Sequence, residues 1–282
     1  MRERPILGIY EKALQPTSFD QMFAKTAQCG FDCFEMSLDG TQEKLARLDW
    51  THEQIEQVRQ ASLRNGVKLL TTCLSGHKRF PLGSSDPSIL RHGMEIMQKA
   101  IDLCGELGIR VIQVSGFDVY DQEPRTAQTR ARFVESLRQC VQMAERACVM
   151  LAIEPVEGNL LTVRDTLTVV NSIASPWLQI YPDPANICSL GVEPVQDIAC
   201  GKGHIVAVHL RDSLLHRYDA TIPFGTGNLD FEGVIRKLDE LSFTGPMIVE
   251  MWNTGQPGDL EMITQARAYL EYIIRKARDA DV

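Results

Sequence analysis

The chain has 282 residues, 44% of them hydrophobic, so it can bury the core of a large single-domain α/β protein. Its formal net charge of −8 repels nucleic acid and anionic membranes, which argues against both as partners. An anionic metabolite would need a local basic pocket.

The N-terminal residues and the cysteines predict a cytoplasmic protein. Arg2, Glu3 and Arg4 lead into only a short apolar run, unlike a signal peptide, and no apolar stretch is long enough to span a bilayer. The eight cysteines form no CxxC pair and lie mostly in apolar segments. They are typical of buried thiols in a reducing compartment, not of disulfides or a zinc ribbon.

Short apolar runs rich in β-branched residues alternate with longer stretches of helical spacing, which is the pattern of repeated βα units. Several runs are apolar without alternation, as in parallel strands covered on both faces. In chain order the eight predicted strands are Ile6–Tyr10, Phe31–Leu38, Lys68–Ser75, Arg110–Gly116, Val149–Glu154, Leu178–Asp183, Ile205–Asp212 and Met247–Trp252.

The stretches between these runs show helical periodicity. Gly108 follows one apolar stripe as a stop signal, and further stripes occupy the stretches after the fourth and eighth strands. The first stripe consists of Met94, Met97, Ala100, Ile101, Cys104 and Leu107, the second of Phe133, Leu137, Val141 and Ala144, and the third of Leu260, Ile263, Ala266, Leu270 and Ile273.

Eight βα units predict an α/β fold, a closed (β/α)8 TIM barrel that forms a single domain over residues 1–282. The alternative is an open doubly wound sheet. Such a sheet usually has a Gly-rich phosphate turn after its first strand, whereas here that strand leads into Tyr10-Glu11-Lys12. The closed barrel is therefore favoured.

Four consecutive predicted strands finish with a side chain that can bind a divalent cation. In a (β/α)8 barrel the C-terminal strand ends carry the reactive residues. Each residue alone is more often a helix cap or a salt-bridge partner, but the set predicts a metal site. The four candidates are Glu154, Asp183, His209 and Glu250. Three carboxylates and an imidazole suit Mn²⁺, Mg²⁺ or Co²⁺, with Zn²⁺ as a further option.

A metal ion on a ketone oxygen favours removal of the neighbouring proton, because it stabilises the enediolate that forms. Glu154 and Glu250 would face each other across the barrel mouth. One would remove the proton and the other would return it on the opposite face, which inverts the carbon centre. The strand ends thus predict an epimerase in which these two glutamates are catalytic.

Five basic side chains at or just beyond strand ends are candidates for binding an anionic group of the substrate, a phosphate in particular. Each alone is more often a solvated surface charge, but together they could form a positive cluster in an acidic protein. They are Lys12, His77, Lys78, Arg79 and Arg211.

Several segments resemble the bacterial L-ribulose-5-phosphate 3-epimerases, which are also described as L-xylulose-5-phosphate 3-epimerases and belong to the xylose-isomerase-like barrels. The resemblance spans nearly the whole chain. The segments are Gly8-Ile-Tyr-Glu-Lys-Ala-Leu14, Phe-Glu-Met-Ser at 34–37, Arg47-Leu-Asp-Trp50, Cys73-Leu-Ser, Arg79-Phe-Pro-Leu-Gly83, Gly108-Ile-Arg-Val-Ile-Gln113, Gly203-His-Ile-Val-Ala-Val-His209 and Glu250-Met-Trp252.

This resemblance implies one divalent metal on the four residues named above, with the two glutamates as the acid/base pair. It also implies a homodimer and a sugar-phosphate substrate, with L-ribulose 5-phosphate and L-xylulose 5-phosphate as the two epimers. Glu157 corresponds to an acidic residue near the sugar hydroxyls, and the Pro223-Phe-Gly-Thr-Gly227 segment is similar to a turn whose backbone N–H groups approach a ligand.

Three other functions remain as alternatives. An aldose–ketose isomerase of the hexulose-6-phosphate isomerase type would use the same metal site. A metal-dependent DNA-repair hydrolase would need further histidines at other strand ends, where this chain has Ser37-Leu38 and Ser115-Gly116. A sugar-sensing protein without catalysis would be expected to have lost Glu154 or Glu250.

Overall fold

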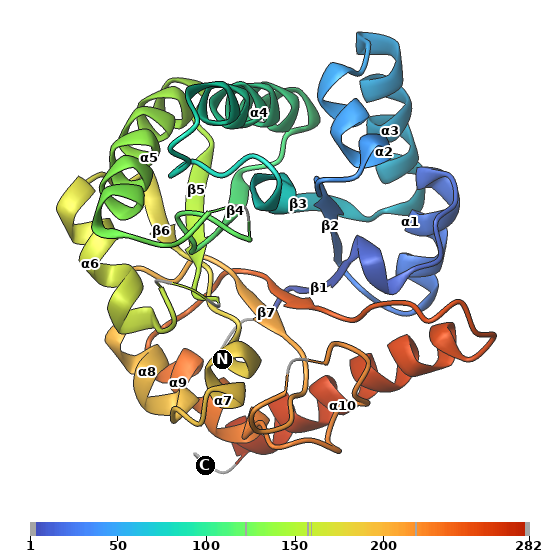
Figure 1. The fold of residues 1–282 in the computed structure, drawn as a ribbon. Helices are drawn as coiled ribbons and strands as arrows, with labels where there is room; N and C mark the ends of the chain where they lie inside the picture. Colours follow the sequence, from blue (N-terminus) through green and yellow to red (C-terminus); the bar gives the residue numbers. More distant parts are fainter. Residues whose placement is uncertain (1–3, 122, 157, 159, 218, 280–282) are drawn as a thin grey trace. The chain divides into compact units, whose positions relative to one another are not determined.

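Eight parallel strands alternate with helices along the chain (Figure 1). The computed structural model describes residues 4–121, 123–156, 158, 160–217 and 219–279. Each predicted apolar run contains one strand. The strands are β1 (Leu7–Tyr10), β2 (Cys33–Ser37), β3 (Lys68–Leu74), β4 (Val111–Ser115), β5 (Met150–Glu154), β6 (Leu178–Ile180), β7 (Val208–Leu210) and β8 (Met247–Val249).

The strands are hydrogen-bonded in the order β6-β5-β4-β3-β2-β1-β8-β7. β1 pairs in parallel with both β2 and β8, and Gly8 lies opposite Cys33 on one side and Ile248 on the other. A Cβ at Gly8 would overlap both of these side chains, so this position of the strand accepts only glycine. Sequential order with the first strand beside the last is the topology of a (β/α)8 barrel and excludes the open doubly wound alternative.

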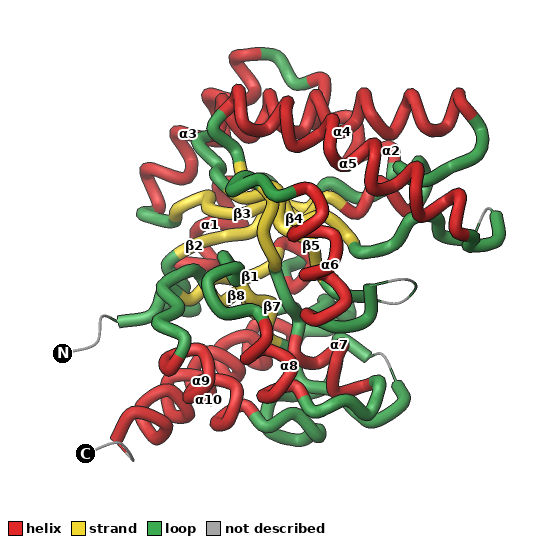
Figure 2. Tube along the Cα trace, turned by 90° about the vertical axis from the view of Figure 1, so that its left-hand side faces the viewer, coloured by secondary structure: helices red, strands yellow, loops and turns green. Residues whose placement is uncertain are grey.

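The chain forms two compact units. The first comprises Met1–Glu35, Ala61–Lys68 and Tyr181–Val282, and it contains β1, β7, β8 and the first three residues of β2. Its helices are α1 (Phe19–Gln28), the 3-10 helix η1 (Glu11–Ala13), α7 (Pro184–Ser189), α8 (Pro194–Cys200), α9 (Phe231–Glu240) and α10 (Asp259–Asp279). Helices α9 and α10 lie side by side (Figure 2).

The second unit comprises Met36–Gln60 and Leu69–Ile180 and contains most of β3 and all of β4, β5 and β6. Helix α3 (His52–Asn65) has residues in both units. The second unit's helices are α2 (Gln42–Leu45), η2 (Ala46–Asp49), η3 (Ser75–Lys78), α4 (Pro87–Leu107), α5 (Ala127–Ala147) and α6 (Val163–Ile173).

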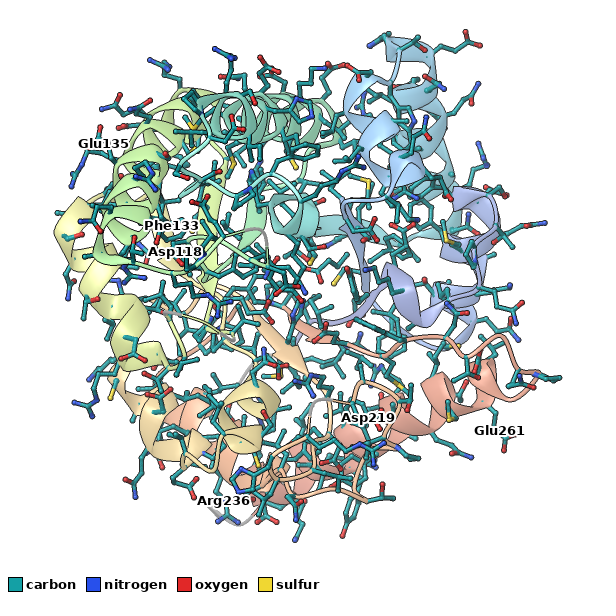
Figure 3. The ribbon with its side chains drawn as sticks, in the orientation of Figure 1. Asp118, Phe133, Glu135, Asp219, Arg236 and Glu261 are labelled. Atoms are coloured by element: carbon teal, nitrogen blue, oxygen red, sulfur yellow. The ribbon has the colours of Figure 1, made fainter. Side chains whose placement is uncertain are left out.

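The predicted helical stripes form buried faces. On α5, Phe133 points inward and is buried, whereas Glu135 points to solvent (Figure 3). Helix α4 ends as predicted at Gly108, which adopts a left-handed conformation (φ 78°) that favours glycine. Burial of these apolar stripes stabilises the helices, because isolated helices of this length are marginal in water.

The eight cysteines all lie among the described residues, where none forms a disulfide, and six of them are buried. Burial raises the pKa of the Cys104 and Cys140 thiols to about 12, so neither forms a reactive thiolate near neutral pH. Within the described ranges, the helices are all too short or too polar to cross a bilayer.

Candidate active site

The four predicted metal ligands lie at the C-terminal ends of the last four strands. Glu154 is the last residue of β5, His209 lies within β7, and Glu250 follows β8 directly. Asp183 follows β6 and caps the N-terminus of α7, where Oδ1 accepts a hydrogen bond from the N–H of Ala185 at 2.8 Å. All four side chains are buried.

In the first unit, Arg211 links two of these carboxylates. Its Nε donates to Oδ2 of Asp183 at 2.7 Å and lies 3.5 Å from Oε2 of Glu250. Its Nη2 donates to Oδ1 of Asn186 at 2.5 Å. Burial raises the pKa of Asp183, and Glu250 adds to this effect, whereas the charge of Arg211 opposes it. Buried acidic groups thus converge here around one buried cation.

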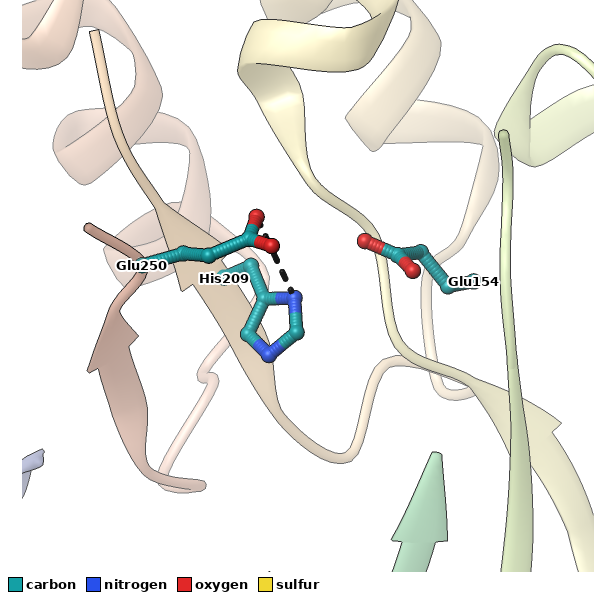
Figure 4. A group of neighbouring side chains, drawn as sticks. All are labelled: Glu154, His209 and Glu250. Atoms are coloured by element: carbon teal, nitrogen blue, oxygen red, sulfur yellow. Dashed lines mark ion pairs between the residues drawn. The ribbon is translucent and has the colours of Figure 1, made fainter. Parts of the chain in front are cut away.

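His209 is held between two carboxylates. Its Nε2 lies 2.6 Å from Oε2 of Glu35, and its Nδ1 lies 3.8 Å from Oε2 of Glu250 (Figure 4). The other oxygen of Glu35, Oε1, accepts a hydrogen bond from Oη of Tyr181 at 2.8 Å. The rings of Tyr181 and Tyr10 lie beside the imidazole, with centroids 4.6 Å and 6.0 Å away.

In the second unit, Glu154 is positioned by its neighbour on β4. Gln113, which is fully buried, donates from Nε2 to Oε2 of Glu154. In the parallel ladder Gln113 lies opposite Ala152, two residues before Glu154, so both side chains point to the same face of the sheet. This hydrogen bond fixes one carboxylate oxygen of Glu154.

Each of the four side chains carries an atom of a kind that binds divalent metal ions. His209, Glu250 and Asp183 belong to the first unit, and Glu154 belongs to the second. The Nε2 of His209 contacts Glu35, and Nδ1 lies on the side of Glu250, another of the four candidate ligands. Oxygen ligands with one imidazole and no thiolate suit a hard or borderline ion.

The predicted phosphate-binding cations lie in different surroundings. Lys12 stacks over the ring of Trp252, with Nζ 5.3 Å from the centroid, and Trp252 is 41% exposed. Lys78 lies over Tyr120 at 4.9 Å. Arg79 is exposed and lies over Phe80 at 5.2 Å. These three cations retain access to solvent and remain suited to an anion.

His77 and Arg211 are buried instead. His77 Nε2 lies 3.1 Å from the carbonyl oxygen of Gly93, and burial lowers the pKa of His77 to about 4, so the imidazole is neutral at pH 7. Arg211 is occupied by Asp183 and Asn186. Glu157 lies outside the described residues.

The Pro223–Gly227 segment is organised around a buried carboxylate. Oδ2 of Asp212 accepts hydrogen bonds from the N–H groups of Gly225 and Gly227, both at 2.8 Å. Its Oδ1 accepts from Ser213 at 2.8 Å and Leu229 at 3.3 Å. Two backbone groups that we expected to approach a ligand are thus bound to Asp212.

Comparison with known proteins identifies a family and relatives that match almost the whole chain. The family described as xylose isomerase-like TIM barrel matches residues 23–274. The chain is 40% identical over 275 residues to the L-ribulose-5-phosphate 3-epimerase UlaE of Escherichia coli O157:H7 (strain EC4115 / EHEC), with 96% of this chain and 95% of that protein covered. The values are the same for UlaE of Shigella sonnei (strain Ss046).

Solved structures show the same fold. The structure of L-ribulose 3-epimerase superposes with a TM-score of 0.81 at 20% identity, covering 99% of this chain and 97% of that one. D-psicose 3-epimerase, solved in the presence of D-fructose, gives a TM-score of 0.79 at 19% identity, covering 95% and 98%.

The fold and the strand-end carboxylates therefore define a xylose isomerase-like TIM barrel. Within that class, the 40% identity to UlaE, which covers 96% of this chain and 95% of UlaE, shows the family. The chain belongs to the family of the L-ribulose-5-phosphate 3-epimerases, as the sequence resemblance predicts.

Proposed function

We propose that this protein is a metal-dependent 3-epimerase that interconverts L-ribulose 5-phosphate and L-xylulose 5-phosphate. The observation that carries the proposal is the pair of buried glutamates, Glu154 and Glu250, at the ends of β5 and β8. The 40% identity to proteins named L-ribulose-5-phosphate 3-epimerase supports the choice of substrate.

One divalent ion, Mn²⁺, Mg²⁺, Co²⁺ or Zn²⁺, is held in this proposal by Glu154, Asp183, His209 and Glu250. The carboxylate-rich donor set favours the first three. When bound, such an ion supplies Lewis acidity that polarises a ketone oxygen. Arg211 would stay bound to Asp183 and keep its oxygens in place, as in the hydrogen bond of 2.7 Å described above.

Glu154 and Glu250 serve as the two bases. In a (β/α)8 barrel, the ends of strands five and eight stand across the mouth from each other, so their carboxylates can reach a carbon from its two faces. One glutamate removes the proton from C3, leaving a planar carbon. The other returns a proton to the opposite face, which inverts C3. Gln113 keeps the carboxylate of Glu154 oriented for this transfer.

Lys12, Lys78 and Arg79 are the candidates for binding the phosphate in this scheme, because each is cationic and none is fully buried. A lysine binds phosphate as a point charge, whereas the planar guanidinium of Arg79 can bind it through two N–H groups. We also assign Glu157 to the sugar hydroxyls.

The experiment is proton NMR of L-ribulose 5-phosphate in D₂O with the protein and catalytic Mn²⁺, which is chelated before acquisition. We expect the C3 proton signal to disappear and the xylulose epimer to appear. We expect no reaction when EDTA is present from the start. Exchange at C1 with an aldose product would replace the proposal with an aldose–ketose isomerase. No reaction with any of the four metals would refute it.

We further propose a single barrel domain over residues 1–282 that works as a cytoplasmic homodimer. Eight cysteines without a disulfide among the described residues, six of them buried, fit a reducing compartment. Three exposed apolar side chains of the first unit, Leu190, Val192 and Leu215, are suitable for a subunit interface. Light scattering coupled to size exclusion would distinguish a dimer from a monomer.

A further inference from the structure

We infer that Glu35, supported by Tyr181, is a positioning residue that presents His209 to the metal through Nδ1. The inference rests on the proposed metal site, but Glu35 and Tyr181 are not among the candidates found at the strand ends. Glu35 lies inside β2, between Phe34 and Met36, and is fully buried. A carboxylate in such a place is costly unless its oxygens are hydrogen-bonded.

Both oxygens of Glu35 have partners. Oε2 lies 2.6 Å from Nε2 of His209, and Oε1 accepts the hydroxyl of Tyr181 at 2.8 Å. The three side chains come from β2, β7 and the residue after β6, and each is at most 1% exposed. The carboxylate therefore cannot rotate or exchange a partner for water without opening the core.

This arrangement selects one tautomer of the imidazole. A carboxylate accepts hydrogen bonds from an imidazole N–H, so we assign the proton of His209 to Nε2. Nδ1 then holds a lone pair, and it is the nitrogen that lies on the side of Glu250, at 3.8 Å. A histidine that donates its other N–H to a carboxylate is also a more basic metal ligand.

Tyr181 has two effects on the pair. Its hydroxyl fixes the second oxygen of Glu35, and its ring packs against the imidazole with the centroids 4.6 Å apart. Both contacts restrict the orientation of His209 before any ion arrives. Removal of the hydroxyl alone should therefore loosen the pair without removing the acceptor of the Nε2 proton.

Two measurements test the inference, neither of which requires turnover. The tautomer of His209 is read from ¹⁵N NMR of the imidazole in metal-free protein at pH 8, with the resonance assigned by its loss in His209→Gln. The dissociation constant of Mn²⁺ is read from calorimetry. Four variants are compared: Glu35→Leu, Glu35→Gln, Tyr181→Phe and, as a control, Asp118→Asn, which alters a buried carboxylate bound to Thr129 and the N–H of Val119.

The wild type is expected to show the Nε2–H tautomer. Glu35→Leu should lose this preference and bind Mn²⁺ about 10-fold to 100-fold more weakly. Glu35→Gln should keep the tautomer, because its amide oxygen accepts the Nε2 proton, but bind roughly 10-fold more weakly. Tyr181→Phe should bind Mn²⁺ between about twofold and tenfold more weakly than the wild type. Asp118→Asn should bind Mn²⁺ as the wild type does.

An Nδ1–H tautomer in the wild type would overturn the inference. So would Mn²⁺ affinities in Glu35→Gln and Tyr181→Phe that match the control, a result that remains readable even if Glu35→Leu does not fold. Because no readout involves a sugar, an inactive wild type with the expected tautomer and affinities would refute the proposed epimerase while leaving the role of Glu35 intact.

Discussion

Arg211 donates from Nε to Oδ2 of Asp183 at 2.7 Å, and both side chains are buried almost completely. The same Nε lies 3.5 Å from Glu250. Burial disfavours the charged form of these carboxylates, and the positive charge of Arg211 offsets this effect. A bound metal cation would act in the same way.

Arg211→Met should lower the free energy of unfolding of the metal-free protein by about 3 kcal/mol, because it leaves buried carboxylates without their cation. Saturating Mn²⁺ should recover part of this loss, since the ion adds positive charge to the same cluster. Urea denaturation in EDTA and in Mn²⁺ measures both values. The exposed Arg79→Met serves as control and should change neither, whereas an equal loss for both variants would contradict this role of Arg211.

His77 should make the protein sensitive to acid. Its pKa falls from an ordinary value of 6.5 to about 4 on burial, so the neutral ring stabilises the fold above pH 6.5 and this contribution is lost as pH falls through 4. Between pH 7 and pH 5 the loss is roughly 2 kcal/mol.

His77→Gln keeps a donor for the carbonyl of Gly93 but cannot titrate. Its free energy of unfolding in EDTA should therefore fall less between pH 7 and pH 5 than that of the wild type. If the free energy of unfolding falls equally with pH in the two proteins, protonation of His77 does not destabilise the fold.

The phosphate proposal predicts selective effects on substrate binding. Arg79→Ala, Lys12→Ala and Lys78→Ala should each raise KM for L-ribulose 5-phosphate, by about 10-fold for a residue that contacts the phosphate. KM for unphosphorylated L-ribulose should stay within twofold. A residue whose replacement affects both sugars equally does not bind the phosphate.

Asp212 should hold the loop that contains Gly225 and Gly227. In Asp212→Asn an amide NH₂ would face backbone N–H groups, so hydrogen exchange at these two glycines should accelerate by about 30-fold, equivalent to ~2 kcal/mol. Asp219→Asn is a matched control in the same loop, because its carboxylate accepts from Thr221 instead. Unchanged protection in Asp212→Asn would remove Asp212 from this role.

The sequence predicts the eight strands because each is a short apolar run, but it overestimates their ends. The run Met247–Trp252 contains a strand only to Val249, although the N–H of Glu250 still donates to the carbonyl oxygen of Leu210 in β7 at 2.9 Å. Two of the four candidate ligands, Asp183 and Glu250, lie in the overestimated parts, whereas Glu154 and His209 belong to their strands. Polar groups at the end of a barrel strand face the substrate side.

Two functional residues cannot be found from the ends of the apolar runs. Glu35 and Gln113 lie inside strands, and their only local signal is a polar residue in an apolar run. The partner of Glu35, His209, is 174 residues away in the sequence, so spacing cannot reveal the pair. The sequence also does not show that His77 is buried and therefore not a surface cation. Its imidazole contacts Gly93 of α4, and the sequence does not reveal this contact.

If Glu154 and Glu250 act on opposite faces of C3, replacing one glutamate at a time separates the two half-reactions. Glu154→Gln and Glu250→Gln, each saturated with Mn²⁺, are incubated in D₂O with either epimer, and deuterium at C3 is followed by NMR. Each variant should lose epimerisation by at least about 10³-fold, yet exchange the C3 proton of one epimer only, the opposite epimer in the two variants. Exchange of the C3 proton of both epimers by the same variant would contradict a mechanism with two bases.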